Sequence, residues 1–331
     1  MNSRYLVTGA SGFVGGALAR ALADGGDCVR ALGRSPTLGT WEEYVTCDLG
    51  RDPLPRDVFD GIDGIFHLAG VAHVQDIAGI PDAVYQRVNV EGTRALLDAA
   101  QTAGVERFVY FSSVKAAADP GSECVDEAWN KPPTDAYGRS KLEAEGLALA
   151  AAASGAMHAT VLRPSLVYGR GVKGNLDRMI GAVAAGRFPP IPEFGNRRSM
   201  VSLPDLVSAA VLAMTDPKGS GRVYIVSDGV DYSTHDLFLA IRGALGRPPP
   251  AWTIPAAMLS AGGHAGDLLE RILLRPMPLS STIMARLAGS ACYRSGRLRD
   301  ELGWAPSQTF YDLVGEIVSE QRQRHAERGR E

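Results

Sequence analysis

A glycine-rich turn between a strand pattern and a helix pattern constrains the fold of this chain more than any other feature. The run Tyr5-Leu6-Val7 is typical of a buried strand, and a helix pattern extends from Phe13 to about Asp24. Between the two stands Thr8-Gly9-Ala10-Ser11-Gly12-Phe13-Val14-Gly15. Gly9 permits a tight bend, Gly12 lets the backbone approach a ligand, and Gly15 lets the helix pack against the strand. Because the N–H groups at a helix start bind anions, the sequence predicts a pyrophosphate-binding turn here.

Strand and helix patterns then alternate through the first half of the chain. Alternation of this kind predicts a parallel sheet with helices on both faces. Right-handed crossovers make it an α/β fold, a Rossmann-type doubly wound parallel sheet. Strands are predicted at Cys28–Leu32, Ile62–Leu68, Phe108–Phe111 and Ala159–Leu162, and helices at Pro81–Gly104 and Thr134–Ala153.

The pattern loosens after Arg163-Pro164, where proline and glycine accumulate. A strand at Val223–Val226 is expected to return to the main sheet. Residues 1–164, plus about 203–227, are therefore predicted to form the dinucleotide-binding domain. Residues 165–202 and 228–331 are predicted to form a smaller, mainly helical substrate-binding domain. A helix predicted at Asp205–Met214 falls in the returning segment of the first domain. The helices of the second domain are predicted at Thr234–Leu245, Ala256–Leu274 and Tyr311–Arg322.

Composition indicates an ordinary globular protein with 45% hydrophobic and 21% charged residues. A net charge of -3 favours neither a nucleic-acid partner nor a membrane partner. Acidic residues interleave with the basic run from Gln321 to His325, so we interpret that run as a solvated helix end. No charged and apolar leader precedes the first strand, and the alanine-rich stretch Ala144–Ala156 is interrupted by polar residues and glycine. A cytoplasmic location is expected.

The four cysteines are Cys28, Cys47, Cys124 and Cys292, and they are widely scattered. Their spacing resembles neither a metal cluster nor a disulfide framework. We therefore predict no metal site, and the absence of a disulfide pattern suits a reducing compartment.

The end of the second strand bears on the choice of cofactor. An acidic residue there would accept a hydrogen bond from the ribose 2′-hydroxyl of NAD, but this chain has Leu32-Gly33-Arg34. Arg34 could instead pair with the 2′-phosphate of NADP. NADP is therefore favoured, with NAD possible and a solvated surface arginine as the alternative. Asp48, followed by Leu49, could hydrogen-bond the adenine, or Asp48 could be a plain turn residue.

Tyr137 and Lys141, in the run Tyr137-Gly138-Arg139-Ser140-Lys141, share one face of a predicted helix because they are four residues apart. The ordinary pKa of tyrosine is about 10, which makes it a poor base at neutral pH. A nearby ammonium and a positive nicotinamide ring would favour the phenolate. A hydroxyl from Ser113, at the end of the strand that continues into Ser112, would reach the same substrate oxygen. The pattern predicts Tyr137 as a general acid/base with Lys141 and Ser113 beside it.

These motifs stand in the order found in the extended short-chain dehydrogenases/reductases, and the chain resembles most the UDP-glucose 4-epimerase-like nucleotide-sugar enzymes of the NAD-dependent epimerase/dehydratase family. The resemblance rests on the glycine turn, His67-Leu68-Ala69-Gly70, Asn89-Val90-Glu91-Gly92-Thr93, Ser112-Ser113, the Tyr137–Lys141 run and Arg163 to Gly169. It continues through Asn196–Val201 and Asp205 to Leu302–Pro306.

The resemblance implies roles for particular residues and a homodimer formed through the two long helices. It assigns catalysis to Ser113, Tyr137 and Lys141. It implies that substrate is bound by Ser113, Tyr137, Asn175, Arg198 and Arg286. The cofactor-binding residues expected from the motifs and the resemblance together are Gly9, Ser11, Gly12, Phe13, Val14, Gly15, Arg34, Asp48, Leu49, Leu68, Ala69, Gly70, Asn89, Ser112, Tyr137, Lys141 and Pro164.

Three departures from the family pattern bear on function. Gly33 and Arg34 replace an acidic strand end, and Leu166 falls where many relatives carry a diphosphate-contacting Asn. Val114-Lys115 replaces the Asp-Glu pair of the 4,6-dehydratases, which argues against dehydration. The resulting hypothesis is redox chemistry at C4 of a nucleotide-activated sugar, by a 4-epimerase or a 4-ketoreductase, with a slight preference for an NADPH-dependent ketoreductase.

Two alternatives stay open at this stage. A reductase or dehydrogenase of a non-nucleotide alcohol, such as a sterol or a flavonoid, would have no use for Arg198 and Arg286. A non-catalytic dinucleotide-sensing protein would commonly lack the Tyr or the Lys, and this chain has both Tyr137 and Lys141.

Overall fold

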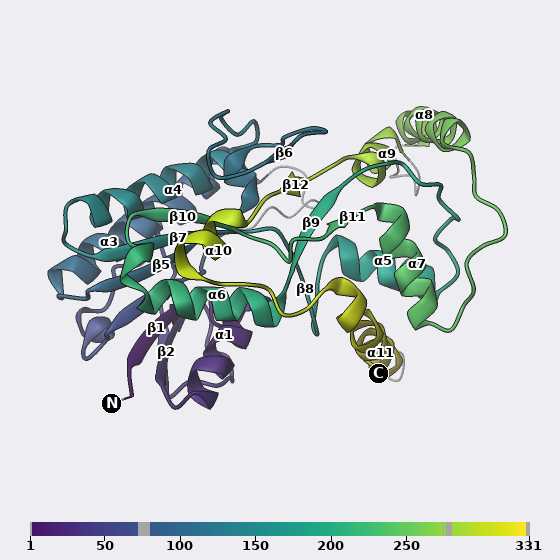
Figure 1. The fold of residues 1–331 in the computed structure, drawn as a ribbon. Coiled ribbons are helices and arrows are strands. Elements are labelled where there is room, and N and C mark those ends of the chain that lie inside the picture. Colours follow the sequence, from purple (N-terminus) through teal and green to yellow (C-terminus); the bar gives the residue numbers. More distant parts are fainter. Residues whose placement is uncertain (1, 72–79, 274, 276–279, 329–331) are drawn as a thin grey trace.

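A seven-stranded parallel sheet forms the centre of the molecule (Figure 1). The computed structural model describes residues 2–71, 80–273, 275 and 280–328. The strand order across the sheet is β10-β7-β5-β4-β1-β2-β3. Every neighbouring pair is parallel, so the predicted doubly wound fold is confirmed. The strands are β1 Arg4–Thr8, β2 Cys28–Gly33, β3 Glu43–Thr46, β4 Gly64–His67, β5 Arg107–Phe111, β7 His158–Pro164 and β10 Arg222–Val226.

Helices cover both faces of this sheet because successive strand residues point to opposite sides. In β1, Tyr5 and Val7 pack into one apolar cluster, with helices α1 Phe13–Asp24 and α6 Leu203–Thr215. Leu6 between them packs into the other, with helices α3 Gly92–Thr102 and α4 Ala136–Ala153. Strands buried on both faces explain why the sequence shows continuous apolar runs rather than alternation.

The long helix predicted at 81–104 is present but contains one irregular turn. It consists of α2 Asp82–Tyr85, a π-helical turn η2 Gln86–Glu91, and α3. A π turn inserts an extra residue into the helix and is frequent at functional sites. Asn89 lies in this turn, and its side chain is buried.

A second group of elements stands beside the carboxyl ends of the sheet strands (Figure 1). A small sheet of β8 Leu166–Tyr168, β9 Arg198–Ser202 and β11 Asp231–Tyr232 packs mainly with three helices around one apolar cluster, to which Leu259 and Met284 of two further helices also contribute. These helices are α5 Asn175–Ala184, α7 Thr234–Ala244 and α11 Phe310–Arg328. The three strands were not predicted, because strands of two to five residues carry little periodicity. Helix α5 was not predicted either, and it lies in the stretch after Pro164 where proline and glycine accumulate.

The remaining elements are short or peripheral. These elements are β6 Cys124–Val125, β12 Cys292–Tyr293, α8 Ala256–Leu273, α9 Ser281–Ala288, α10 Gly296–Leu302 and the 3-10 turns η1 Arg56–Phe59, η3 Val114–Ala117 and η4 Pro217–Gly219. Helix α8 agrees with the prediction up to Leu273, and position 274 lies outside the described residues.

A buried carboxylate joins the two groups of elements. Asp205, on α6, accepts hydrogen bonds from Ser202, from the backbone and hydroxyl of Ser307, and from the backbone N–H of Gln308. Leu298 and Trp304 near the C-terminus pack into the apolar cluster of α1 and α6. The predicted return of the strand at Val223–Val226 to the main sheet is confirmed, because β10 pairs with β7. The division into two domains stays a prediction.

The basic run near the C-terminus differs from its interpretation as a solvated helix end. Gln321 is buried in α11, and its amide donates to the backbone oxygen of Asp177 at 2.7 Å. Arg324 pairs with Asp177 and Glu320. No helix within the described residues is both long and apolar enough to cross a bilayer.

Candidate active site

The candidate site is a cleft at the carboxyl ends of the strands, where the order of the sheet reverses around β1. Strand β1 lies between β2 and β4, so the chain must cross the sheet after β3, and ligands bind at such switch points. The cleft has a volume of about 590 Å³. Predicted cofactor residues that line it are Gly9, Gly12, Phe13, Val14, Gly15, Leu68, Gly70, Ser112, Tyr137, Lys141 and Pro164.

The glycine turn has the shape that a bound pyrophosphate requires. Gly9 has φ +71°, and a Cβ there would lie 2.9 Å from the Ala69 nitrogen. At Gly12, which caps α1, a Cβ would meet only the Gly9 oxygen at 3.1 Å and otherwise face the open cleft. The first turn of α1 carries no acidic residue, and its N–H groups have no intrahelical acceptor. These residues fit the pyrophosphate of a dinucleotide.

Tyr137 and Ser113 meet in the cleft from different elements. Ser113 follows β5 in an extended conformation and caps the 3-10 turn η3. Tyr137 stands in the first turn of α4, whose start is capped by Asp135. Burial raises the pKa of Tyr137 to about 12, and its hydrogen bond with Ser113 opposes that rise. The phenol is therefore neutral at physiological pH, which is the form that donates a proton.

Lys141 lies on the same face of α4 but is turned towards the sheet. Its ammonium donates to the Phe111 carbonyl oxygen at 2.6 Å and lies 4.3 Å from the centre of the Tyr110 ring. Burial lowers the pKa of Lys141 to about 7, although Glu145 opposes the shift. The expectation that a nearby ammonium and a positive nicotinamide ring make Tyr137 more acidic stays a prediction for the cofactor-bound enzyme. In the ligand-free protein, burial raises the pKa of Tyr137.

Glu145, which the sequence analysis missed, organises the floor of this site. Its carboxylate accepts two hydrogen bonds from Arg163 of β7, at 2.9 Å and 2.6 Å, and both side chains are buried. It also accepts a short hydrogen bond from the Ser112 hydroxyl. The available signal was its position, one turn after Lys141 on the same helix face, with an arginine in the following strand.

Asn89 supports the cleft wall from behind instead of lining it. Its amide oxygen accepts from the Val71 backbone at 2.7 Å, and its nitrogen donates to Val71 and to the Ser140 hydroxyl. A second buried chain runs from Thr8 through His67 to Thr93. Burial lowers the pKa of His67 to about 3, so the ring is neutral and structural.

The residues predicted around the adenine ribose lie outside the residues that line the cleft. Arg34 is exposed in the segment after β2. Asp48 is half-buried beside Arg51, its backbone N–H donates to Asp52, and Leu49 packs into the core. Ser11 is exposed, and Ala69 lies partly buried under the glycine turn.

On the substrate side, Arg198 alone of the three predicted anion-binding residues lines the cleft. Its guanidinium donates to Thr234 at 3.1 Å and to the carbonyl oxygen of Arg286, and burial lowers its pKa. The side chains of Asn175 and Arg286 are exposed and are not among the lining residues. Further lining residues, mostly apolar, are Val71, Phe111, Val114, Lys115, Ser165, Leu166, Val167, Ser199, Ala291 and Tyr293.

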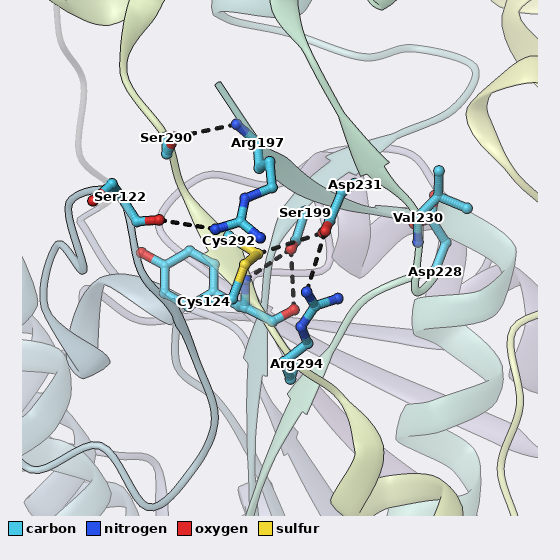
Figure 2. A network of polar contacts seen from close by, with 11 residues as sticks. Ser122, Cys124, Arg197, Ser199, Asp228, Val230, Asp231, Ser290, Cys292 and Arg294 are labelled. Carbon is cyan, nitrogen blue, oxygen red and sulfur yellow. Dashed lines mark hydrogen bonds and ion pairs between the residues drawn. A yellow bond between two sulfur atoms is a disulfide. The ribbon is translucent and has the colours of Figure 1, made fainter. Parts of the chain in front are cut away.

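A disulfide joins Cys124 and Cys292 beside this wall, so the prediction of no disulfide is wrong (Figure 2). The two residues are 168 positions apart and face each other because β6 and β12 pair in parallel. Asp231 lies next to them, and these three are spaced like metal ligands, but the two sulfur atoms are bonded to each other. The scattered cysteines are therefore no argument for a reducing compartment.

The fold and this site define a class: short-chain dehydrogenases/reductases, in which a Rossmann domain binds a nicotinamide dinucleotide. The model of the NAD dependent epimerase/dehydratase family matches residues 5–227. The chain belongs to that family, and it is an enzyme of the NAD-dependent type. The family assigned from the resemblance is confirmed.

Similar proteins include enzymes with different substrates. The chain is 31% identical to UDP-glucose 4-epimerase of Vibrio cholerae, over 94% of this chain and 93% of that protein. It is 32% identical to a 3-beta-hydroxysteroid dehydrogenase of Mycolicibacterium neoaurum, over 95% and 90%. A solved structure of MoeE5 in complex with UDP-glucose and NAD is 25% identical, covers 98% of this chain and 100% of its own, and has a TM-score of 0.74.

The burial of Lys141 makes a prediction about stability. Its folded pKa of about 7 lies below the unfolded value of 10.5, so above about pH 7 the unfolded chain binds a proton that the folded chain does not. The free energy of unfolding should therefore rise from about pH 7 to about pH 9 in the wild type. Lys141→Met should remove most of this rise, and Lys173→Met, at an exposed position, should keep it. Urea denaturation at several pH values measures both, and equal slopes in all three proteins would contradict the assignment.

Proposed function

We propose that this enzyme transfers hydride at C4 of a nucleotide-activated sugar, as a 4-ketoreductase or a 4-epimerase. The observation that carries the proposal is the shared cleft. Gly12 at the pyrophosphate turn, Tyr137 hydrogen-bonded to Ser113, and Arg198 of β9 all line it. This arrangement supports a substrate whose reacting oxygen lies at Tyr137 and whose diphosphate lies at Arg198.

In this proposal the residues of the chain hold the oxygen and move its proton. Hydride exchange with the substrate carbon is the chemistry that a bound nicotinamide supplies. Ser113 orients the substrate oxygen, and the neutral Tyr137 phenol gives it a proton during reduction. Lys141, fixed at the Phe111 carbonyl, stands where it can hold the nicotinamide ribose. The neutral phenol is the form that donates the proton during reduction, a step that a 4-ketoreductase and a 4-epimerase share.

A second candidate is a dehydrogenase or reductase of an apolar alcohol. The lining of the cleft by Leu166, Val167 and Val114 favours it, as does the exposed position of Arg286. Similarity to a steroid dehydrogenase points the same way. Arg198 favours the nucleotide sugar, because an arginine in a half-buried cleft is costly to desolvate without an anion to pair with.

Product analysis separates these candidates. We expect turnover of at least one UDP-, GDP- or dTDP-sugar, or of its 4-keto derivative, detected by mass spectrometry with NADPH or NADH present. Isomerisation without net cofactor consumption would identify an epimerase. Turnover of sterol-type alcohols with no turnover of any nucleotide sugar would contradict the proposal and support the second candidate.

Tyr137→Phe should lower kcat by roughly 10²–10⁴, because the variant loses only the proton-transfer group. Cofactor affinity should change little. The control is Tyr85→Phe, which alters the neighbouring ring 6.0 Å away but not the proposed acid. Turnover is measured on the active substrate, and cofactor binding is measured by titration. A Tyr137→Phe variant with near-normal kcat would show that another group transfers the proton.

We also propose NADP(H) as the preferred cofactor, on the basis of Gly33 and Arg34. Arg34→Ala should weaken NADPH binding by roughly 1.5–3 kcal/mol and leave NADH binding nearly unchanged. A carboxylate at position 33 should shift the preference to NAD. A side chain there would collide with the Tyr44 hydroxyl, which is buried without a partner, so Gly33→Asp is best combined with Tyr44→Phe.

Isothermal titration of both cofactors against each variant measures these preferences, with Tyr44→Phe alone as the matched control. A wild type that prefers NAD, together with equal effects of Arg34→Ala on both cofactors, would contradict NADP selection. That result would favour an epimerase that retains NAD.

A further inference from the structure

Helix α8 presents most of its large apolar side chains to solvent, and its buried face consists of Leu259 and two glycines. Met258, Leu268, Ile272 and Leu273 are 65%, 59%, 66% and 55% exposed, and Leu269 is also exposed. With Ala261 and Ala265 they recur every three or four positions, which places them in one stripe along the helix. This stripe, from Met258 to Leu273, is called the α8 stripe below.

The inward face of α8 explains why the helix is oriented in this way. Leu259, Gly263 and Gly266 are buried. A Cβ at Gly263 would lie 3.2 Å from Met284 of α9 and from the Ser280 backbone, so a larger residue would have to displace a neighbour and glycine suits this close packing. An ordinary amphipathic helix buries its wide apolar face. Here the geometry of packing on α9 leaves the wide apolar face outside.

The charges that border the α8 stripe in solvent are basic. His264 and Arg271 are exposed on the helix, and Arg275 follows it. The acidic residues of the helix are engaged or half-buried: Asp267 accepts from the Ser281 backbone at 3.0 Å and lies 4.0 Å from the His264 ring, and Glu270 is half-buried. The full positive charges that border the stripe are therefore those of Arg271 and Arg275. The exposed Trp252 lies in the segment before the helix. An apolar stripe with basic borders and a tryptophan is the composition of helices that lie in the surface of a membrane.

A second copy of the chain fits this face less well than a bilayer does. A helix of 18 residues is about 27 Å long, and a stripe about 10 Å wide offers on the order of 300 Å² per copy. Two such faces together would bury about half of the roughly 1,200 Å² of surface that the smallest stable protein interfaces bury. The long helices through which the resemblance implies a dimer, α3 and α4, lie at the opposite end of the molecule from α8 (Figure 1).

We propose that the α8 stripe binds the surface of a lipid bilayer that contains anionic lipids. The expectation of no membrane partner rested on net charge and on the lack of an uninterrupted apolar stretch, and a surface-lying helix requires neither. The bound face would lie close to the active-site cleft. Helix α8 packs on α9, where the Arg286 carbonyl accepts from Arg198 of the cleft wall. The inference is independent of which substrate or cofactor the enzyme uses.

Vesicle co-sedimentation of the purified full chain tests this proposal. The probes are phosphatidylcholine vesicles with and without about one third phosphatidylglycerol, since basic residues near a surface favour anionic lipid. We expect the wild type to bind the anionic vesicles more tightly than the neutral ones. Leu268→Glu combined with Ile272→Glu should weaken binding to both at least about tenfold, and Arg271→Gln should weaken only anionic binding, by about fivefold.

Leu38→Glu is the matched control, because Leu38 is fully exposed and lies outside α8. It should bind vesicles like the wild type. All four positions are exposed, so the variants should unfold at the temperature of the wild type. Absence of vesicle binding by the wild type would overturn the proposal, as would equal binding by the Leu268→Glu/Ile272→Glu variant. If the wild type does not bind vesicles but forms a dimer that these substitutions dissociate, the α8 stripe binds a second copy of the chain instead.

Discussion

The buried ion pair between Glu145 and Arg163 is the contact on which the geometry of this site depends. It ties α4 to β7, and through the Ser112 hydroxyl it ties both to the end of β5. A pair this deeply buried adds little net stability, because the cost of desolvation offsets the attraction. Removal of one partner is nevertheless destabilising, because it leaves the other charge buried without a counter-charge. The positions of Ser113, at the end of β5, and of Lys141, one turn before Glu145, follow from that contact. Glu145 is a positioning residue for both.

The same burial decides the protonation states in the cleft. With Lys141 held at the Phe111 carbonyl, its pKa falls to about 7, while that of Tyr137 rises to about 12. Both shifts disfavour charge, so the cationic side chains that line the cleft besides Lys141 are Arg198 and Lys115, and Lys115 pairs with Asp119. A site in that state is ready to donate a proton to a carbonyl oxygen. It also leaves Arg198 as the group to which an anionic substrate is drawn.

The sequence predicted those parts of the molecule that local patterns specify. The order of strands and helices, the glycine turn and the Tyr137–Lys141 spacing each lie within a few residues, where periodicity and backbone geometry are informative. What it failed to predict depends on distant contacts. Cys124 and Cys292 meet only because β6 and β12 pair, and neither strand is longer than two residues. The side-chain amide of Asn89 is hydrogen-bonded to Val71 and Ser140, and no rule of sequence spacing predicts these contacts.

The substrate side of the cleft shows why a shared fold leaves the substrate open. Its walls come from β8, β9 and the segment around Ala291, which the small sheet and the disulfide hold together, and not from the dinucleotide-binding strands. The proposed hydride chemistry depends on Tyr137, Ser113, Lys141 and the cofactor turn, none of which belongs to these walls, so the walls are free to vary without loss of the reaction. In this chain they combine one arginine with leucine and valine. That mixture suits a substrate with an anionic group beside an apolar surface, and the charge on Arg198 is the feature on which the proposal of a nucleotide sugar rests.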